Sequence, residues 1–208
     1  MERNVRHNTP RNEFVNRLLP PTPEQTELTR RWILEYRDLI LSDVQVLRER
    51  ADKKLLRDPK VRAQTRQWDR PYPLGYCGEI RNEVMDQLQG GMLDRGHPGL
   101  QAVKSFVREG GVIQPFWGID SQKYFQNAIQ IGDSILDVAN DTVDRSKPPI
   151  VFYPSVAEAP IKRIEDFGEY ASVAESYWNY DVYPNIYLPA FAPIFPYVVI
   201  EPPVHPDL

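Results

Sequence analysis

The chain has 208 residues, of which 41% are hydrophobic and 26% charged, and its formal net charge is -4. This usage is ordinary for a globular protein, so it excludes a fibrous repeat and wholesale disorder. A mildly acidic chain also lacks the strong positive field on which non-specific phosphate binding depends, so we expect no nucleic-acid partner.

The first 21 residues are polar and arginine-bearing and end in Pro20-Pro21, which predicts an extended or disordered arm over 1–21. Thr22 then supplies a helix cap, and Gln25 stands three residues later, as in a capping box. Apolar residues recur at helical spacing from Leu28 to Leu47, so we expect one long helix from Thr22 to about Arg50.

The remaining elements follow from the same two periodicities, 3.6 for helices and 2 for strands. The turn at Gly132-Asp133 joins two of the strands as a hairpin. Helices are predicted over 51–67 with a restart at Pro59, over 77–90, over 100–109 and over 164–179, and strands over 112–119, 124–131 and 134–139. The pattern predicts an α+β fold, with N-terminal helices first and a cysteine-bearing helix packed on a small antiparallel sheet. We expect residues 22–182 to form a single domain.

The last segment, 183–208, is rich in proline and aromatic residues, which predicts an extended strand with polyproline-like stretches. Tyr187, Phe191 and Phe195 offer rigid apolar groups that suit docking into the groove of a protein or peptide partner. The alternative is that these rings pack back onto their own domain. Prolines interrupt the most apolar stretch, Ile186 to Ile200, so we expect no membrane segment.

Cys77 is the single cysteine, so an intrachain disulfide is excluded. No secretory leader pattern is visible, and we expect a cytoplasmic protein. The thiol stands where a turn leads into an amphipathic helix, and unpaired N–H groups at such a position favour the nucleophilic thiolate. Cys77 is therefore a candidate nucleophile.

The predicted hairpin brings a carboxylate and an amide together. If Ile131 pairs with Ser134, counting back makes Gln126 and Asp137 diagonal neighbours on one face of the sheet, with Asn127 on the other face. Asp137 also belongs to a string of aspartates, but the spacing lacks the glycine and terminal glutamate of a calcium loop. We predict no metal and no cofactor.

These residues resemble the papain and transglutaminase-like cysteine hydrolase superfamily, on the segments Tyr76-Cys77-Gly78-Glu79 and 126–137. The resemblance covers residues 73–142 and implies a helix-start cysteine, then a strand carrying histidine and a next strand carrying aspartate. Cys77 and Asp137 match these positions, whereas Gln126 occupies the place of the histidine. A carboxamide does not accept the thiol proton at neutral pH.

Three interpretations remain open. In the first, the fold is a catalytically degenerate relative that acts in protein binding or assembly. In the second, it is an active thiol-dependent amidohydrolase, peptidase or acyltransferase, with the base supplied by His97, His205 or His7, or with the glutamine marking an inactive variant. In the third, Cys77 is a small buried apolar residue and Asp137 satisfies nearby backbone groups.

Overall fold

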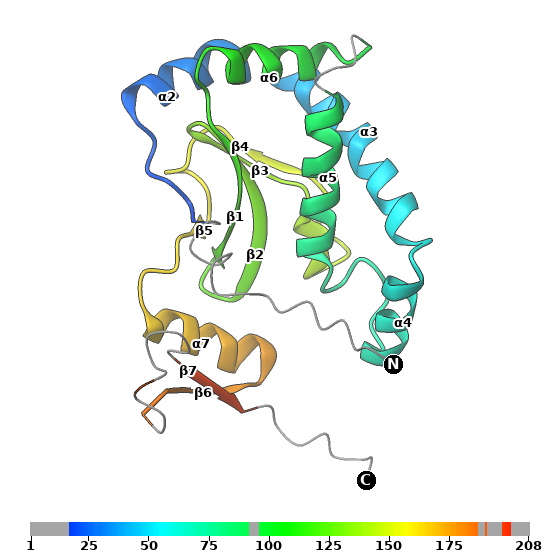
Figure 1. Cartoon of the computed structure of the whole chain (residues 1–208), viewed down its shortest axis with the longest axis vertical. Helices are drawn as coiled ribbons and strands as arrows, with labels where there is room; N and C mark the ends of the chain where they lie inside the picture. Colours follow the sequence, from blue (N-terminus) through cyan, green and yellow to red (C-terminus); the bar gives the residue numbers. More distant parts are fainter. Residues whose placement is uncertain (1–16, 92–95, 187–189, 191–196, 201–208) are drawn as a thin grey trace.

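A curled antiparallel sheet with the strand order β4-β3-β2-β1-β5 lies at the centre of the part of the chain that the structure describes. The structure is a computed structural model and describes residues 17–91, 96–186, 190 and 197–200. Helices cover one side of the sheet (Figure 1). The fold is α+β, which confirms the predicted class. The strands are β1 (Ile113–Asp120), β2 (Tyr124–Ile131), β3 (Ser134–Asp137), β4 (Val151–Tyr153) and β5 (Ile161–Lys162).

The helices follow the predicted order, with one interruption in the first of them. The long N-terminal helix is divided by a π-helical turn, and the charge-rich helix restarts at Pro59 behind the cap Asp58, as expected. The helices are α2 (Pro23–Thr29), η1 (Arg30–Leu34), α3 (Arg37–Leu55), α4 (Pro59–Trp68), α5 (Cys77–Gly91), α6 (Pro98–Arg108), the 3₁₀ turn η2 (Asn140–Thr142) and α7 (Phe167–Trp178).

The π turn changes which side of the first helix is buried. Ile33 is fully buried, whereas Tyr36 and Leu39, expected on the apolar stripe, are 37% and 47% exposed. A π turn inserts one extra residue and rotates the following helix relative to the preceding one. Past this turn the core positions are Ile40, Val44 and Leu47, which agree with the predicted stripe.

The cap at Thr22 forms as predicted, because its Oγ1 accepts the backbone N–H of Gln25 at 3.3 Å. The Gln25 side chain does not return to the cap, however. Its Nε2 donates to the carbonyl of Gly110 and its Oε1 accepts the N–H of Val112. The expected capping box is therefore only half formed, and the glutamine instead fastens α2 to the segment that enters β1.

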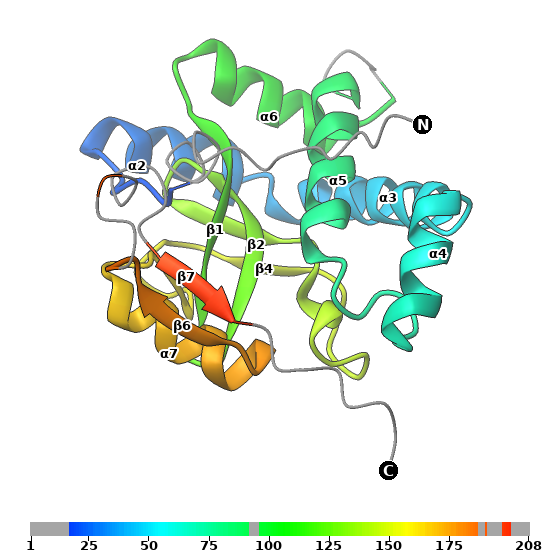
Figure 2. The ribbon, with the colours of Figure 1, turned by 60° about the horizontal axis from the view of Figure 1, so that its bottom comes forward.

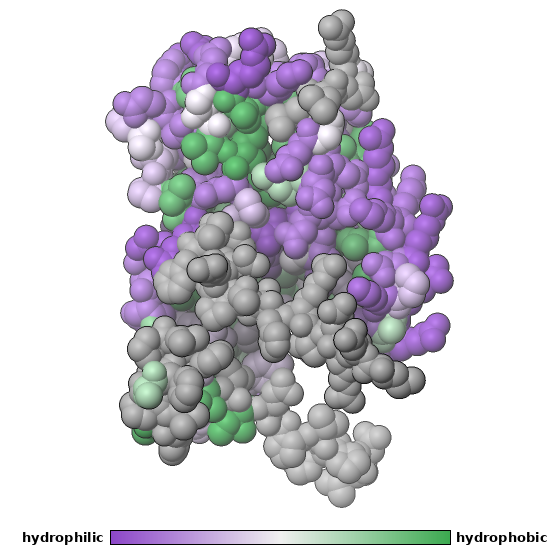
Figure 3. Space-filling view, in the orientation of Figure 1, coloured by the Kyte–Doolittle hydropathy of each residue, from purple (hydrophilic) through white to green (hydrophobic). Residues whose placement is uncertain are grey.

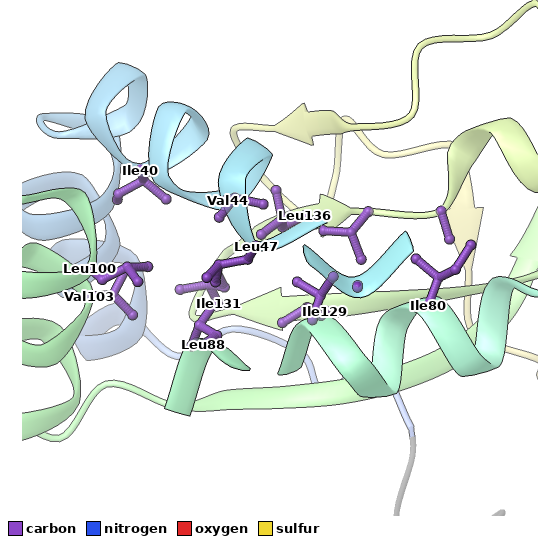
Figure 4. Packing of buried hydrophobic residues seen from close by; sticks show 14 of the residues in the cluster. Ile40, Val44, Leu47, Ile80, Leu88, Leu100, Val103, Ile129, Ile131 and Leu136 are labelled. Atoms are coloured by element: carbon purple, nitrogen blue, oxygen red, sulfur yellow. The ribbon is translucent and has the colours of Figure 1, made fainter. Parts of the chain in front are cut away.

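The main core lies between α3, α5, α6 and one face of the sheet. Its residues come from all of these elements and lie within contact distance of one another (Figure 4). Those labelled in the figure are Ile40, Val44, Leu47, Ile80, Leu88, Leu100, Val103, Ile129, Ile131 and Leu136. A second, smaller cluster on the opposite face contains Phe116, Ala128, Ile135 and Ile161.

The hairpin register matches the prediction, since Ile131 pairs with Ser134 and Ile129 with Leu136. Gly132 in the turn has a φ of +59°, a conformation that favours glycine. Side chains alternate along each strand, so Ile129 and Leu136 face α5 while Ala128 faces the second cluster. This alternation decides which polar side chains meet Cys77.

The described part of the tail is not simply extended. β6 (Asp181–Pro184) pairs antiparallel with β7 (Tyr197–Ile200), so the expected boundary at residue 183 falls inside a strand. Backbone pairing satisfies the N–H and C=O groups that a polyproline-like segment leaves to water. The two strands lie beside α7, below the main sheet in Figure 1 and towards the viewer in Figure 2.

The described residues visible in Figure 3 are mostly hydrophilic, with an apolar area in the upper part, in the region of α6 and the start of β1. Exposed large apolar side chains of these segments include Val107 and Val112. Among the described residues, no helix combines the length and the apolar character needed to span a membrane.

Gly99 marks the closest approach of α6 to α3. A Cβ at this position would lie 2.4 Å from the backbone carbonyl of Leu39 and 2.5 Å from the N atom of Ile40. We expect Gly99→Ala to lower the free energy of unfolding by about 1–3 kcal/mol, because two backbones must separate. Urea denaturation measures this loss.

The matched control is Gly90→Ala, in α5, where a Cβ meets nothing within 4 Å. This substitution should leave stability unchanged or raise it by up to about 1 kcal/mol, because alanine is the better helix former. An equal loss in both variants would contradict the close approach.

Candidate functional site

A cleft of about 330 Å³ lies on the sheet face that carries α5 and α7. Its floor consists of Trp117 from β1 and of Phe125 and Asn127 from β2. Trp117 is paired directly with Asn127 in the strand register, and the two residues of β2 are two positions apart. The period of 2 therefore places all three side chains on the same face.

Two segments far apart in the sequence form the walls of this cleft. One wall includes Arg70 and Cys77, from the turn that precedes α5 and from the first residue of that helix. The other includes Tyr177 and Trp178 at the end of α7, and Tyr180 just beyond it. Cys77 is thus at the edge of an aromatic cleft that only the packing of α7 against β2 creates.

The polar partner of the thiol is Asn127. Its Nδ2 donates to Cys77 Sγ at 3.3 Å. Burial raises the pKa of Cys77, and the hydrogen bonds from Asn127 only partly oppose this effect. The thiol is therefore protonated over a wider pH range than a free cysteine, which weakens it as a nucleophile at neutral pH.

Gln126 and Asp137 meet each other, as the register predicted. Gln126 Nε2 lies 3.0 Å from Oδ1 and 2.9 Å from Oδ2 of Asp137, and it also donates to the carbonyl of Ala139. Oδ1 of Asp137 accepts the N–H of Ala139 at 2.8 Å. Burial raises the pKa of Asp137 to about 7, and Asp120 and Asp141 act in the same direction.

The structure thus separates the three candidate site residues, because Cys77 does not meet Gln126 and Asp137. Gln126 precedes Asn127 in β2, so its side chain points to the opposite face of the sheet from the one that contacts Cys77. Gln126 and Asp137 form a pair, and Cys77 pairs with Asn127 instead. The sequence contained a signal for this arrangement. Ile80, Val84 and Leu88 lie on the same face of the helix as Cys77, so this helix face packs on the side of the sheet with the larger apolar residues. That side carries Asn127.

His97 does not serve as the base for Cys77. It stands at the start of α6, where its Nδ1 lies 3.1 Å from Oδ1 of Asp43. Cys77 is the first residue of α5, whereas α6 lies near the other end of that helix (Figure 1). At a rise of 1.5 Å per residue, the two ends of α5 are roughly 20 Å apart. His7 and His205 lie outside the described residues.

Tyr187, Phe191 and Phe195, the binding residues expected in the tail, also lie outside the described residues. Another tail residue, Tyr197, packs on α7, with its ring centroid 5.0 Å from that of Tyr170. The described part of the tail thus agrees with packing against the same domain. The aromatic groups that line the cleft come instead from β1, β2 and α7, which the sequence did not mark as a site.

Among the described residues, no group of three or more His, Cys, Asp or Glu side chains is arranged to hold a metal ion. Comparisons of the chain with models of protein families, with curated proteins and with solved structures find no match. The function must therefore be argued from the geometry of the cleft.

Proposed function

We propose that this protein is a catalytically degenerate relative of the papain and transglutaminase-like cysteine hydrolases, and that it binds a protein or peptide in the cleft beside Cys77. The observation that carries the proposal is the amide of Asn127 at 3.3 Å from the sulfur. A cysteine hydrolase needs a proton acceptor near its thiol, and the NH₂ group of an amide is a donor.

The surroundings of the thiol support the same conclusion. Burial, the largest influence, raises the pKa of Cys77, whereas nucleophilic cysteines have a lowered pKa. Among the described residues, five aromatic side chains line the cleft, and such groups bury large areas with little loss of conformational freedom. Those side chains belong to Trp117, Phe125, Tyr177, Trp178 and Tyr180.

A thiol-dependent amidohydrolase, peptidase or acyltransferase is the second candidate. One observation favours it, namely that Cys77 lines the cleft at the first residue of a helix. The N–H groups at such a helix start stabilise negative charge. This function still requires a base, and His97, the one histidine among the described residues, precedes α6 and contacts Asp43.

Alkylation of Cys77 by iodoacetamide separates the two candidates, and the single cysteine makes the reading unambiguous. We expect the rate to rise with pH along a titration at or above the free-thiol value of about 8.5. A titration well below that value would contradict the degenerate site and favour the enzyme.

Asn127→His should turn the unreactive thiol into a reactive one. An imidazole at this position faces Cys77 and accepts its proton, so we expect the alkylation rate near pH 7 to rise by at least about tenfold. Gln126→His is the matched control, because the neighbouring side chain faces Asp137 on the other side of the sheet. A larger rise in the control than in Asn127→His would show that the assigned faces are reversed.

A further inference from the structure

The formal charge on the described lining of the cleft beside Cys77 is positive. Among the described residues that line it, Arg70 carries the only formal charge, and no carboxylate lines it. Burial of Tyr177 raises the pKa of its phenol, and the nearby Arg70 counteracts part of this rise, so the guanidinium acts on the interior of the cleft. The lining therefore attracts an anion and repels a cation.

A second cation, Arg81, is buried near Cys77. Arg81 follows Cys77 by one helical turn and is only 5% exposed. Among the described residues, its Nε has no hydrogen-bond partner and its Nη1 makes one long contact of 3.4 Å with the carbonyl of Phe116. Phe116 directly precedes Trp117 in the floor. Within the described part of the chain, Arg81 has no carboxylate within ion-pair distance, which is costly for a buried charge.

The nearby acids offset this charge without forming an ion pair with it among the described residues. Glu79 acts electrostatically on both Arg81 and Cys77, and Asp137 acts on Cys77. Burial raises the pKa of both carboxyl groups, that of Asp137 to about 7, so the negative charge of Asp137 is reduced near neutral pH. Burial also lowers the pKa of Arg81, as expected of a guanidinium without a counterion.

The shape of the cleft indicates what accompanies the anion. Trp117 and Phe125 stack with ring centroids 4.9 Å apart, and Phe125 packs against Trp178 at 4.4 Å. These rings form one stacked aromatic wall, and aromatic faces also suit methylated ammonium groups, but Arg70 opposes any cation. The volume of about 330 Å³ is at the small end for ligand pockets and suits one large side chain.

We propose that the cleft binds the C-terminal carboxylate of a peptide whose last residue is aromatic. The ring packs on the accessible parts of Trp117 and Trp178, whose rings cover Phe125, and the carboxylate lies towards Arg70. Trp178 is 37% exposed and Arg70 is exposed, so the mouth is at the surface and the rest of the peptide leaves through it. This proposal rests on the proposed binding function and names its ligand.

Calorimetric titration with acetyl-Gly-Ser-Gly-Phe, as the free acid and as the C-terminal amide, tests the proposal on the full chain. We expect the acid to bind and the amide to bind at least about tenfold more weakly, since a charge-assisted hydrogen bond is lost. Arg70→Gln should weaken the binding of the acid to the affinity of the amide. Arg50→Gln, an exposed arginine of α3 that does not line the cleft, should change neither.

Equal binding of the acid and the amide would overturn the proposed recognition of a carboxylate, and so would failure of both peptides to bind. Binding of acetyl-phenylalanine as tight as that of the peptide would assign the site to a small molecule and overturn the peptide end. None of these results concerns the thiol. Failure of the degenerate-site proposal is detected separately, by the alkylation of Cys77. Thermal unfolding of Arg70→Gln confirms that this variant is folded.

Discussion

Arg48→Met should lower the free energy of unfolding by about 3–5 kcal/mol, the cost of removing one partner from a buried ion pair. Arg48 is 2% exposed and lies in the middle of α3. Its Nε donates to Asp52 at 2.9 Å, and Nη1 and Nη2 donate to the two carboxylate oxygens of Asp141 at 3.1 Å each. Nη1 also donates to the carbonyls of Val138 and Pro149.

The size of this effect follows from what the arginine joins. Val138 and Asp141 follow β3, and Pro149 precedes β4, so one side chain holds α3 to both segments. Methionine fills a similar volume but leaves buried carbonyls and carboxylates without donors, and each such group is costly. Arg48→Lys should lower the free energy of unfolding by less than Arg48→Met, because lysine keeps the charge. It should still lower it, because lysine lacks the planar fork of donors.

Arg50→Met is the matched control, because Arg50 lies two residues further along α3 and is exposed. Its change in stability should stay within about 0.5 kcal/mol. Chemical denaturation at neutral pH measures all three variants. A loss below about 1 kcal/mol for Arg48→Met would contradict the role assigned to this network.

Asp137→Asn should remove a pH dependence of stability that amounts to roughly 4 kcal/mol in the parent protein. Burial raises the pKa of Asp137 from 3.8 to about 7. Between these values the folded protein holds a proton that the unfolded chain releases. Stability from this group is therefore complete below about pH 4 and is lost as the pH rises to about 7.

The hydrogen bonds that Asp137 accepts from Ala139 and Gln126 favour the carboxylate and lower its pKa, so they offset the effect of burial only in part. Oε1 of Gln126 is buried and has no hydrogen-bond partner. A protonated Asp137 keeps a carbonyl oxygen that accepts from Nε2 of Gln126, and an asparagine at this position keeps one in the same way. Asparagine also keeps an acceptor for the N–H of Ala139.

Denaturation of the parent and of Asp137→Asn at a series of pH values measures the effect. The stability of the variant relative to the parent should grow between about pH 4 and about pH 7 and then stay constant. Leu136→Val, at the preceding position of β3, controls for a loss of packing, which should be equal at every pH. A constant difference between Asp137→Asn and the parent would refute the raised pKa.

The positions of the local elements were predictable because their signals are short-range. β2 has the predicted bounds of Tyr124–Ile131, and α5 begins at Cys77 as expected. The hairpin turn at Gly132-Asp133 and the helix restart at Pro59 depend on backbone preferences of a few residues. β4 and β5 were not predicted, because strands of three and two residues show no periodicity.

The C-terminal part was less predictable, for a different reason. β6 and β7 are separated by twelve residues, and nothing in either segment specifies the other as its partner. Proline and aromatic content predicted extended backbone, and the described residues 183–184 and 197–200 are in strands, but their pairing depends on contacts with α7. Val182 packs with Ile119 and Phe125 under that helix.

The sequence by itself determined the amphipathic helix that starts at Cys77, the hairpin register and the pairing of Gln126 with Asp137, because each depends on residues close together in the chain. The tertiary structure decided that α5 covers the face of Asn127, and that α7 completes an aromatic cleft around the thiol. Those two outcomes depend on packing between segments up to a hundred residues apart, and such packing is governed by the burial of whole faces and not by local spacing.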